Sequence, residues 1–241
     1  MLSLCWYLMT ELTFGLTAPA PCSYLPAQQE QVIFLLPSYP IDASLYQQLL
    51  QHNFRRSGND VYRPHCAACQ ECQSVRLDVR AFRANRRQQR ILRKAKRDQL
   101  QLRFGKPAAK SYYPLYKHYI EARHPDGAMY PPSQQQLDSL LECHWANVEV
   151  LEVYHQQTLI AVSVVDVLDK VLSAVYTFYH PAYQRYSPGI LAILLLIEQA
   201  QLQQKDYLHL GYYVADCAKM AYKAEFLPQQ RFSSEKWRSI G

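Results

Sequence analysis

The chain has 241 residues, of which 49% are hydrophobic and 19% charged, enough apolar material for one large core or two smaller ones. Only 7 Gly against 14 Pro and 19 Tyr argues against a Gly-rich nucleotide-binding fold. The longest uncharged apolar run, Gly189 to Ile197, is too short to cross a bilayer, so we expect no membrane span.

The Leu-rich start of the chain is not expected to be a secretory leader. No Lys or Arg precedes the apolar stretch, Glu11 interrupts it, and Pro21 disturbs a lipoprotein cleavage site before Cys22. We therefore predict a cytoplasmic protein. In such a reducing compartment an odd number of cysteines, 7, favours free thiols or a metal site over disulfides.

Residues 22 to 80 are predicted to form a small mixed module. It contains a strand at Val32 to Leu36, a helix at Ala43 to Asn53, a turn at Gly58 and a strand at Ser74 to Val79. We expect this module to belong to an N-terminal domain.

A compact cysteine motif lies in this module. Cys66, Cys69 and Cys72 follow one another at C-x-x-C spacing, and Cys22 could supply a fourth soft ligand. Four thiolates suit zinc or an iron–sulfur cluster. The alternative is a set of buried or redox-sensitive thiols without a metal, and both interpretations stay open.

A strongly basic segment runs from Arg76 to Arg97. Its ten basic residues and one acid give it a net charge of +9, which leaves −3 for the rest of a chain whose total is +6. On a helix, one side would carry Arg83, Arg87, Arg90, Lys94 and Arg97, while Ile91, Leu92 and Ala95 pack inward. Like charges at this spacing repel one another, so the segment favours a bound polyanion over a bare solvated surface.

The second half of the chain shows a different pattern of predicted helices and strands. Helices are predicted around Tyr112 to Arg123 and Ser133 to Cys143, then strands at Val148 to Tyr154, Leu159 to Leu168 and Val171 to Tyr179, a helix from Pro188 to about Gln204, a strand at Tyr207 to Val214 and a helix at Cys217 to Phe226. This order is typical of a GNAT-type acyltransferase core. We predict an α+β fold with two domains, residues 1–100 and 101–241.

Several short motifs, in order along the chain, carry a family resemblance. They are Cys22-Ser23-Tyr24-Leu25, Phe54-Arg55-Arg56-Ser57-Gly58, Tyr62-Arg63-Pro64 with the three cysteines, Asp166-Val167-Leu168, Leu172 to Phe178, and Gly211-Tyr212-Tyr213 leading to Lys219 to Lys223. With them the chain resembles the bacterial aspartate/glutamate leucyltransferases, relatives of the eukaryotic arginyl-tRNA-protein transferases. The resemblance covers about residues 10 to 235, and residues 1–8 lie outside it.

The resemblance implies transfer of leucine from leucyl-tRNA to the α-amine of proteins that begin with Asp or Glu, which marks them for degradation in the N-end rule pathway. Arginyl-tRNA is the alternative donor, and an apolar or an acidic side-chain pocket would distinguish the two. No cofactor is required, because the ester is already activated and an amine with a pKa of about 8 is partly neutral. The eukaryotic relatives have Cys-x-x-Cys where this chain has Cys22-Ser23-Tyr24-Leu25, so one expected metal ligand is missing.

The resemblance also implies roles for single residues. Asp166, at a predicted strand end, is expected to orient the amine or accept its proton, with a plain turn residue as the alternative. Tyr176 is expected to hydrogen-bond the leaving ribose hydroxyl, although a strand tyrosine is more often a packing residue. Lys219, Tyr222 and Lys223 lie on one predicted helix, where the two lysines share a face and could hold tRNA phosphates or an acceptor carboxylate.

Arginines are the other candidates for the acceptor carboxylate, because a guanidinium group forms bidentate pairs. These candidates are Arg55, Arg56 and Arg76. Further substrate contacts are expected from Ser74, Phe178, Gly189, Tyr212 and Tyr213. The segment from Arg185 to Gly189 would offer free backbone N–H groups to a phosphate where it enters the helix.

Two other classes of function stay open. A non-catalytic, metal-dependent nucleic-acid-binding protein would need only the cysteine motif and the basic helix. A CoA-dependent acetyltransferase would fit the fold, although such enzymes normally carry a small glycine where this chain has Ser187. The sequence predicts no oligomeric state.

Overall fold

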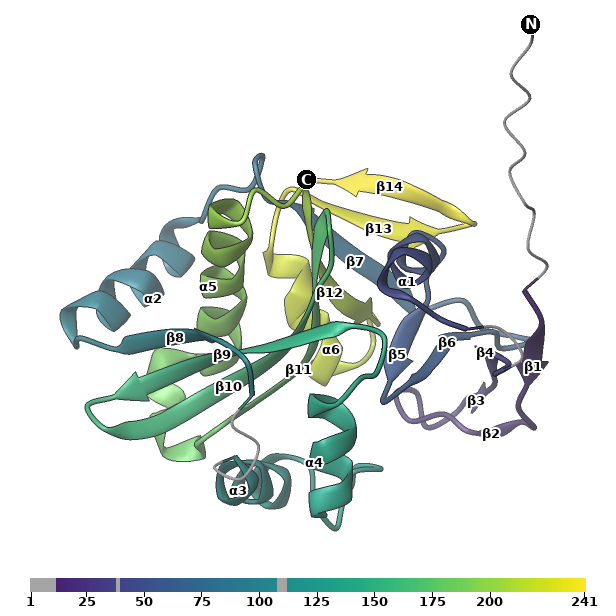
Figure 1. The fold of residues 1–241 in the computed structure, drawn as a ribbon, viewed down its shortest axis with the longest axis horizontal. Helices are drawn as coiled ribbons and strands as arrows, with labels where there is room; N and C mark the ends of the chain where they lie inside the picture. Colours follow the sequence, from purple (N-terminus) through teal and green to yellow (C-terminus); the bar gives the residue numbers. More distant parts are fainter. Residues whose placement is uncertain (1–11, 38–39, 108–111) are drawn as a thin grey trace, which may run out of the picture.

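The computed structural model describes residues 12–37, 40–107 and 112–241, so the predicted extension at residues 1–8 lies outside the described chain. The described residues form a mixed α/β structure with an eight-stranded, a four-stranded and a two-stranded sheet. Figure 1 shows the large sheet and its helices beside the smaller N-terminal part. Within these residues, none of the helices has the length and apolar character needed to cross a membrane.

The N-terminal part is a small antiparallel sheet with one helix. Its strands lie in the order β1 (Phe14–Leu16), β4 (Val32–Leu35), β6 (Asp60–Pro64) and β5 (Arg55–Ser57), and the separate pair is β2 (Ala20–Pro21) with β3 (Gln29–Glu30). Helix α1 (Ala43–Leu50) begins at Asp42, whose carboxylate accepts a hydrogen bond from the Leu45 N–H (2.7 Å). The buried side of α1 and these strands share an apolar cluster of their own.

Helix α1 ends before the predicted boundary at Asn53. Asn53 has a left-handed backbone (φ 69°), which ends the helical path. Its side-chain amide accepts a hydrogen bond from the Ser74 N–H (2.9 Å) and donates one to the Cys72 carbonyl (3.3 Å). The end of α1 is therefore tied to the strand that follows the cysteine motif.

The large sheet contains most of the rest of the chain. Its strand order is β14 (Lys236–Ile240), β13 (Gln229–Ser233), β7 (Gln73–Asp78), β12 (Tyr207–Tyr213), β11 (Val171–Tyr179), β10 (Thr158–Val167), β9 (Asn147–His155) and β8 (Gln101–Gly105). All neighbours whose pairing is described are antiparallel except β11 and β12, which run parallel. Strands β9 to β11 are rich in β-branched residues, which suit a buried sheet.

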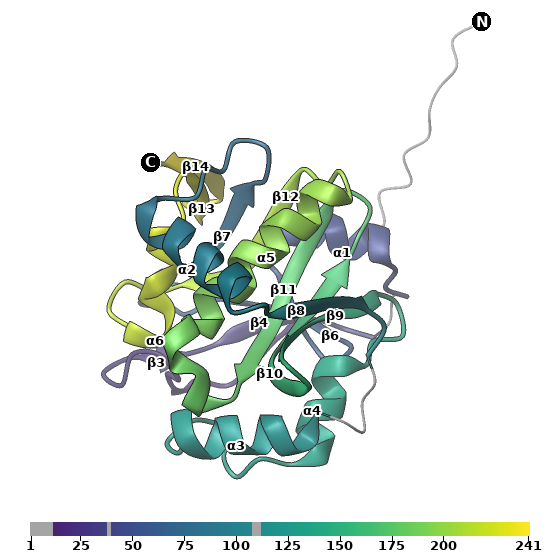
Figure 2. The ribbon, with the colours of Figure 1, turned by 90° about the vertical axis from the view of Figure 1, so that its left-hand side faces the viewer.

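Helices cover one face of the large sheet and one end of its strands. Figure 2 shows α5 (Pro188–Leu202) across the central strands with α2 (Arg86–Arg97) next to it, and α3 (Tyr113–Arg123) and α4 (Gln134–Leu141) below the strands. The remaining helical turns are η2 (Pro181–Tyr186), α6 (Ala218–Ala221) and η3 (Tyr222–Glu225). Helix α5 is buried along most of its length, so it forms the centre of the main core.

The structure confirms most predicted elements of the second half, and β11 has the predicted bounds. The C-terminal end differs. The predicted helix at Cys217 to Phe226 is two short turns, α6 and η3, and the hairpin β13–β14 was not predicted. This hairpin turns through Ser234 and Glu235, both with positive φ, so it lacks the Gly or Asn that usually marks such a turn.

The change from the small sheet to the large one lies between β6 and β7, earlier than the predicted boundary near residue 100. Strand β7 pairs with β12 and β13, and Ala95 of α2 is buried in the main core, with Ile91 and Leu92 packed against it. The apolar side of the basic helix therefore belongs with the large sheet, because that is where it buries its area.

Candidate functional site

The two parallel strands β11 and β12 pair only at one end. Val171–Ser173 pair with Tyr207–His209, and no further pairs join these two described strands. Beyond this point Arg55 of β5 reaches between them: its Nη2 donates to the Ala174 carbonyl, and its guanidinium lies 3.7 Å from where a side chain on Gly211 would begin. We call this place the strand junction.

Lys223 lies at the same junction. Its Nζ donates to the Tyr212 carbonyl (2.5 Å) and is also 3.7 Å from the position of a side chain on Gly211. Gly211 has a φ of +78°, a backbone conformation that favours glycine. A side chain at this position would also lie close to both cations, so the backbone and the surroundings both suit a glycine. Burial, and then the nearby charge of Arg55, lower the pKa of Lys223 to about 7.

Neither cation has an acidic partner. In the described part of the chain no carboxylate forms an ion pair with Arg55 or Lys223, and Arg55 Nη1 has no hydrogen-bond partner there. Both side chains are buried, at 7% and 6% exposure of their residues. Buried like charges without a counter-ion are costly, so this arrangement favours binding of an anion.

Three more buried polar groups lie around the junction. Ser74, Ser173 and His209 are each at most 1% exposed, and their Oγ, Oγ and Nε2 atoms have no hydrogen-bond partner among the described residues. Ser173 is paired with His209 across the two parallel strands. Burial, followed by the charges of Arg55 and Arg76, holds the pKa of His209 well below its usual range, so its imidazole is neutral.

Four of the cysteines line a cavity of about 540 Å³. Cys22, Cys66, Cys69 and Cys72 all line it, and Tyr212 of β12 forms part of the same wall. Burial, and then the neighbouring thiols, raise the pKa of Cys72 to about 12, so this thiol is protonated. Across the described ranges no three side chains of His, Cys, Asp or Glu are placed to hold a metal ion.

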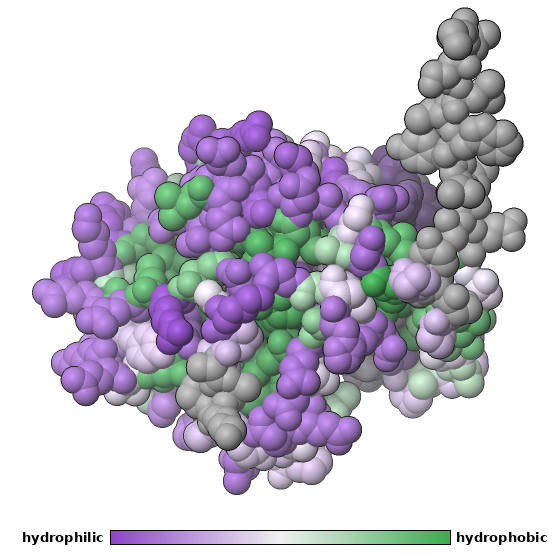
Figure 3. Space-filling model, viewed as in Figure 1, coloured by the Kyte–Doolittle hydropathy of each residue, from purple (hydrophilic) through white to green (hydrophobic). Residues whose placement is uncertain are grey.

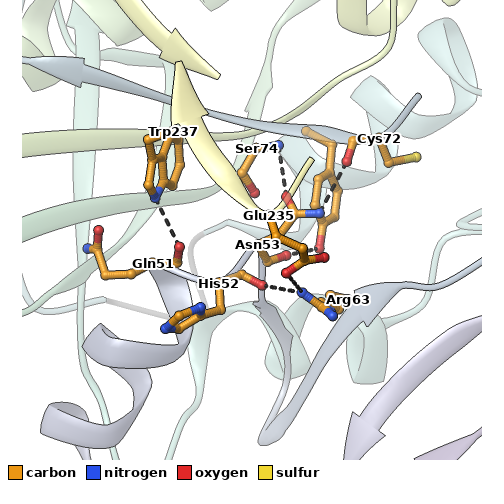
Figure 4. A network of polar contacts seen from close by, with 9 residues as sticks. Gln51, His52, Asn53, Arg63, Cys72, Ser74, Glu235 and Trp237 are labelled. Carbon is orange, nitrogen blue, oxygen red and sulfur yellow. Dashed lines mark hydrogen bonds and ion pairs between the residues drawn. The ribbon is translucent and has the colours of Figure 1, made fainter. Parts of the chain in front are cut away.

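One wall of this region is held by polar contacts at the end of α1 (Figure 4). Arg63 Nη1 donates to the His52 carbonyl and to Glu235, both at 3.1 Å. The Trp237 indole N–H donates to the Gln51 carbonyl (2.9 Å). These bonds connect α1 to β6 and to the C-terminal hairpin.

A basic helix forms from Arg86 to Arg97, and Asn85 caps it together with Gln88, so Arg83 lies before the helix and not on its predicted cationic side. Its predicted cationic side is only partly free. Arg87 pairs with Glu225, Arg97 with Asp98 (2.8 Å), and Lys94 Nζ donates to the Arg185 carbonyl (2.9 Å). Arg83 donates to the Arg80 and Phe82 carbonyls, whereas Arg90 is exposed and forms no ion pair within the described chain. Figure 3 shows hydrophilic side chains over this end of the molecule.

Comparison with known proteins gives a family for the whole chain. The family model "Arginine-tRNA-protein transferase, C terminus" matches residues 111–233, and "Arginine-tRNA-protein transferase, N terminus" matches residues 20–90. The chain belongs to the arginine-tRNA-protein transferase family. This makes it an aminoacyltransferase.

Curated relatives of this transferase are named aspartate/glutamate leucyltransferase. One from Aeromonas hydrophila is 44% identical over 96% of this chain and 98% of its own length, and one from Saccharophagus degradans is 42% identical over 95% and 97%. Among solved structures, the C-terminal domain of a protein described as a lysylphosphatidylglycerol synthetase from Agrobacterium fabrum has a TM-score of 0.51 at 14% identity, over 83% of this chain and 64% of that one. That likeness concerns the fold alone.

Asp166 of the transferase is engaged by Arg56, and Arg55 of the strand junction also acts on its pKa. It is fully buried, and its Oδ1 lies 2.7 Å from Nη2 of Arg56, which is also buried. Burial raises the pKa of Asp166, and Arg56 acts against that shift. Lys219, by contrast, is exposed on α6. The expected groove between Asp166 and Lys219 is therefore not seen, because Asp166 is occupied by Arg56.

Lys219 and Lys223 do not share a helix face. The chain tightens from α6 to the 3₁₀ turn η3 at Tyr222, which rotates the following side chains relative to an α-helix. Lys219 points to solvent and Lys223 inward, and Tyr222, half-buried between them, packs against the main core. Burial, and then Tyr179, raise the pKa of Tyr222 to about 12.

Arg76 is held between two aromatic rings. Its guanidinium lies 4.1 Å from the ring centres of Tyr207 and Trp237, and its Nε donates to Gln230 (2.6 Å). Burial lowers the pKa of Arg76. Arg56 already has a carboxylate and Arg76 is stacked, so Arg55 is the predicted arginine with a free donor at the junction.

The remaining predicted residues are dispersed. Phe178 is fully buried against Tyr116 (5.6 Å between rings), so it is a core residue and not a substrate contact. Tyr176 is half-buried beside Tyr119, and burial raises its pKa. Tyr213 stacks on Arg231 (3.7 Å), and Gly189 lies in the first turn of α5 with open space around its Cα. Tyr212, buried, donates to the Asn53 carbonyl (2.9 Å).

Sequence reasoning missed Ser173 and His209. Both lie inside strands that read as buried apolar sheet, and nothing in their local sequence marks them. Only the topology brings them together, because the parallel pairing of β11 and β12 sets Ser173 beside His209.

Proposed function

We propose that this transferase moves leucine from leucyl-tRNA to the α-amine of proteins that begin with Asp or Glu, with the strand junction as the acceptor site. The observation that carries the activity is the 44% identity, over nearly the full length of both chains, to a protein named aspartate/glutamate leucyltransferase. Its chemistry is aminolysis: the neutral amine attacks the ester carbonyl, a C–N bond forms, and the bond between the carbonyl carbon and the ribose oxygen breaks. The amine proton leaves and the ribose hydroxyl is released.

In this proposal Arg55 and Lys223 bind the side-chain carboxylate of the acceptor. Both are buried cations without an acidic partner in the described chain, and Arg55 has a free donor. A carboxylate there would gain two charge-assisted hydrogen bonds and neutralise the site. An acceptor beginning with a neutral residue would leave Arg55 without a counter-charge and would not hold Lys223, whose pKa is lowered to about 7, in its charged form, which gives a physical reason for selectivity.

The donor site, where leucyl-tRNA would bind, is proposed on the side of β11 away from the strand junction. The exposed cations of α2, Arg90 among them, would contact tRNA phosphates. The first turn of α5, which begins at Pro188, would offer backbone N–H groups, starting with that of Gly189, to a phosphate near the 3′ end. Lys94 connects the two regions through its hydrogen bond to the Arg185 carbonyl.

Leucine is preferred to arginine as the transferred residue. Within the described chain the buried carboxylates are Glu152 and Asp166, and each already faces an arginine, at 3.6 Å and 2.7 Å respectively. Asp166 Oδ2 has no hydrogen-bond partner there, but the charge of Asp166 is already balanced by Arg56. A pocket for an arginine side chain would need a buried acid that is free to pair. An apolar pocket needs none.

Three finer features belong to the same proposal. The order of β9, β10, β11, α5 and β12, with parallel strands joined only at one end, supports a GNAT-type acyl-transfer core. The enzyme would act in the cytoplasm, and its transfer step would need no cofactor, because the ester supplies the activation. Metal analysis of anaerobically prepared protein tests whether the four cysteines bind zinc or iron in solution.

One assay tests the proposal against its competitors. Purified protein is incubated with labelled leucyl-tRNA, arginyl-tRNA or acetyl-CoA, together with matched peptides that begin with Asp, Glu or Ala. We expect label only from leucyl-tRNA and only on the Asp and Glu peptides. Label from arginyl-tRNA or acetyl-CoA alone would assign the other donors, and label on no peptide would leave a nucleic-acid-binding protein without catalysis.

A further inference from the structure

A row of aromatic rings crosses one end of the molecule. It consists of His118 on α3, His180 after β11, Tyr183 in η2 and His155 at the end of β9, and we call it the ring row. Its neighbouring ring centres are 4.8, 5.5 and 5.6 Å apart, with 24°, 83° and 59° between the ring planes. His118 therefore stacks on His180, whereas Tyr183 meets its two neighbours edge-on or tilted. His118 is exposed and the other three are half-buried.

The ring row is connected to the basic helix. Tyr183 stacks on Tyr186 (6.3 Å, 19° between planes), and Tyr186 is buried at 2% exposure. Lys94 of α2 and Arg185 both lie over the Tyr186 ring, at 5.3 and 5.0 Å. The cations therefore connect to the ring row through Tyr186, and together these residues span α2, η2, α3 and β9.

A contact fixes the tautomer of one ring of the row. His180 Nδ1 accepts a hydrogen bond from the Ala182 N–H (3.2 Å), which fixes the tautomer with the proton on Nε2. His118 stacks on it with an angle of 24° between the planes. Core packing accounts for buried Tyr186, but it gives no reason for His118, which leaves a ring in contact with solvent.

We infer that the ring row is a stacking platform for the unpaired nucleotides at the 3′ end of the aminoacyl-tRNA. Aromatic side chains beside a cationic groove are the usual means of binding single-stranded nucleic acid, because every base has a π face. Double-stranded RNA offers no such faces to stack on, so phosphate contacts of α2 alone would not need the row. This inference rests on the proposed function in that tRNA is the donor.

The position of the ring row suits that role. His180 directly follows β11, the strand whose Ala174 carbonyl binds Arg55 at the strand junction. His180 lies six positions after Ala174, or roughly 20 Å along an extended chain. A single strand lying along the row could therefore extend its terminal ester toward the junction while its phosphates face the cations of α2.

The test uses ring removal at two surface positions. His118→Ala and His155→Ala, alone and together, are compared with His118→Phe and His155→Phe, which keep a ring. Binding of uncharged tRNA is measured twice, with the 3′ end intact and with its unpaired nucleotides trimmed off. We expect each Ala variant to bind intact tRNA about tenfold more weakly, both Phe variants to bind it like the wild type, and all variants to bind trimmed tRNA equally.

Two outcomes would overturn the platform: Ala variants that bind intact tRNA like the wild type, or a loss of affinity that is the same for intact and trimmed tRNA. Thermal melts of each variant exclude unfolding as the cause of a loss. The binding readout does not depend on catalysis. A wild-type protein that prefers intact tRNA but transfers no leucine would therefore sink the proposed function and leave the platform standing.

Discussion

Arg56 and Asp166 form an ion pair of 2.7 Å in which neither side chain is exposed to solvent. The pair connects β5 of the small sheet with β10 of the large one, and Arg56 also donates to the Leu140 carbonyl at the end of α4 (3.2 Å). It therefore holds the small sheet in place and, through the neighbouring position in β5, places Arg55 at the strand junction.

Asp166→Asn is expected to destabilise the protein by about 3–5 kcal/mol, because Arg56 stays buried without its counter-charge. Urea unfolding followed by circular dichroism measures the loss. The double variant Arg56→Met/Asp166→Leu should lose less, since it removes both buried charges. Wild-type stability together with lost turnover in Asp166→Asn would instead return Asp166 to a role in catalysis.

Lys223→Met is expected to raise the KM for acceptors that begin with Asp or Glu by about tenfold or more, because the variant cannot form one charge-assisted hydrogen bond to the carboxylate. The KM for leucyl-tRNA should stay near that of the wild type. The matched control is Lys219→Met, which removes an exposed lysine only four residues away. Equal effects of the two variants would mean that the acceptor carboxylate does not bind at the strand junction.

The same lysine should make stability depend on pH. Its pKa is lowered from 10.5 to about 7 in the folded protein, so the unfolded chain binds more protons between these values. Its contribution to stability is therefore fully present above the unfolded pKa and is lost as the pH falls toward 7, with a slope of at most about 1.4 kcal/mol per pH unit.

Urea unfolding of the wild type and of Lys223→Met between pH 7 and 9.5 checks this expectation. The range stops below the region where buried tyrosines ionise. The unfolding free energy of the wild type should rise with pH relative to that of the variant. Parallel curves would mean that Lys223 keeps an ordinary pKa.

Local patterns predicted the elements but not the site. Strand β11 and helices α2, α3 and α5 could be predicted because each shows its own period of apolar residues. The hairpin β13–β14 could not, because Ser234 and Glu235 form its turn without Gly or Asn.

The roles of the candidate residues depend on partners far along the chain. Arg55 and Arg56 are neighbours in sequence with the same chemistry, yet Arg56 pairs with Asp166, 110 residues away, and Arg55 does not meet an acid in the described chain. Likewise the spacing of Lys219 and Lys223 suits one helix face, but the change to a 3₁₀ turn sends them in different directions. Tertiary pairing decides which cation stays available.

Charge reversal on α2 should separate free cations from paired ones. Arg90→Glu is expected to raise the KM for leucyl-tRNA more than Arg97→Glu, because Arg90 is exposed without an ion pair in the described chain and Arg97 is already bound to Asp98 (2.8 Å). Removing a cation that binds one phosphate should also lower the slope of log affinity against log salt by roughly 0.7 to 0.9. Filter binding of tRNA over a salt series measures both the affinity and this slope. If Arg90→Glu keeps the wild-type slope, phosphates do not bind this face of α2 and the donor must lie elsewhere on the transferase.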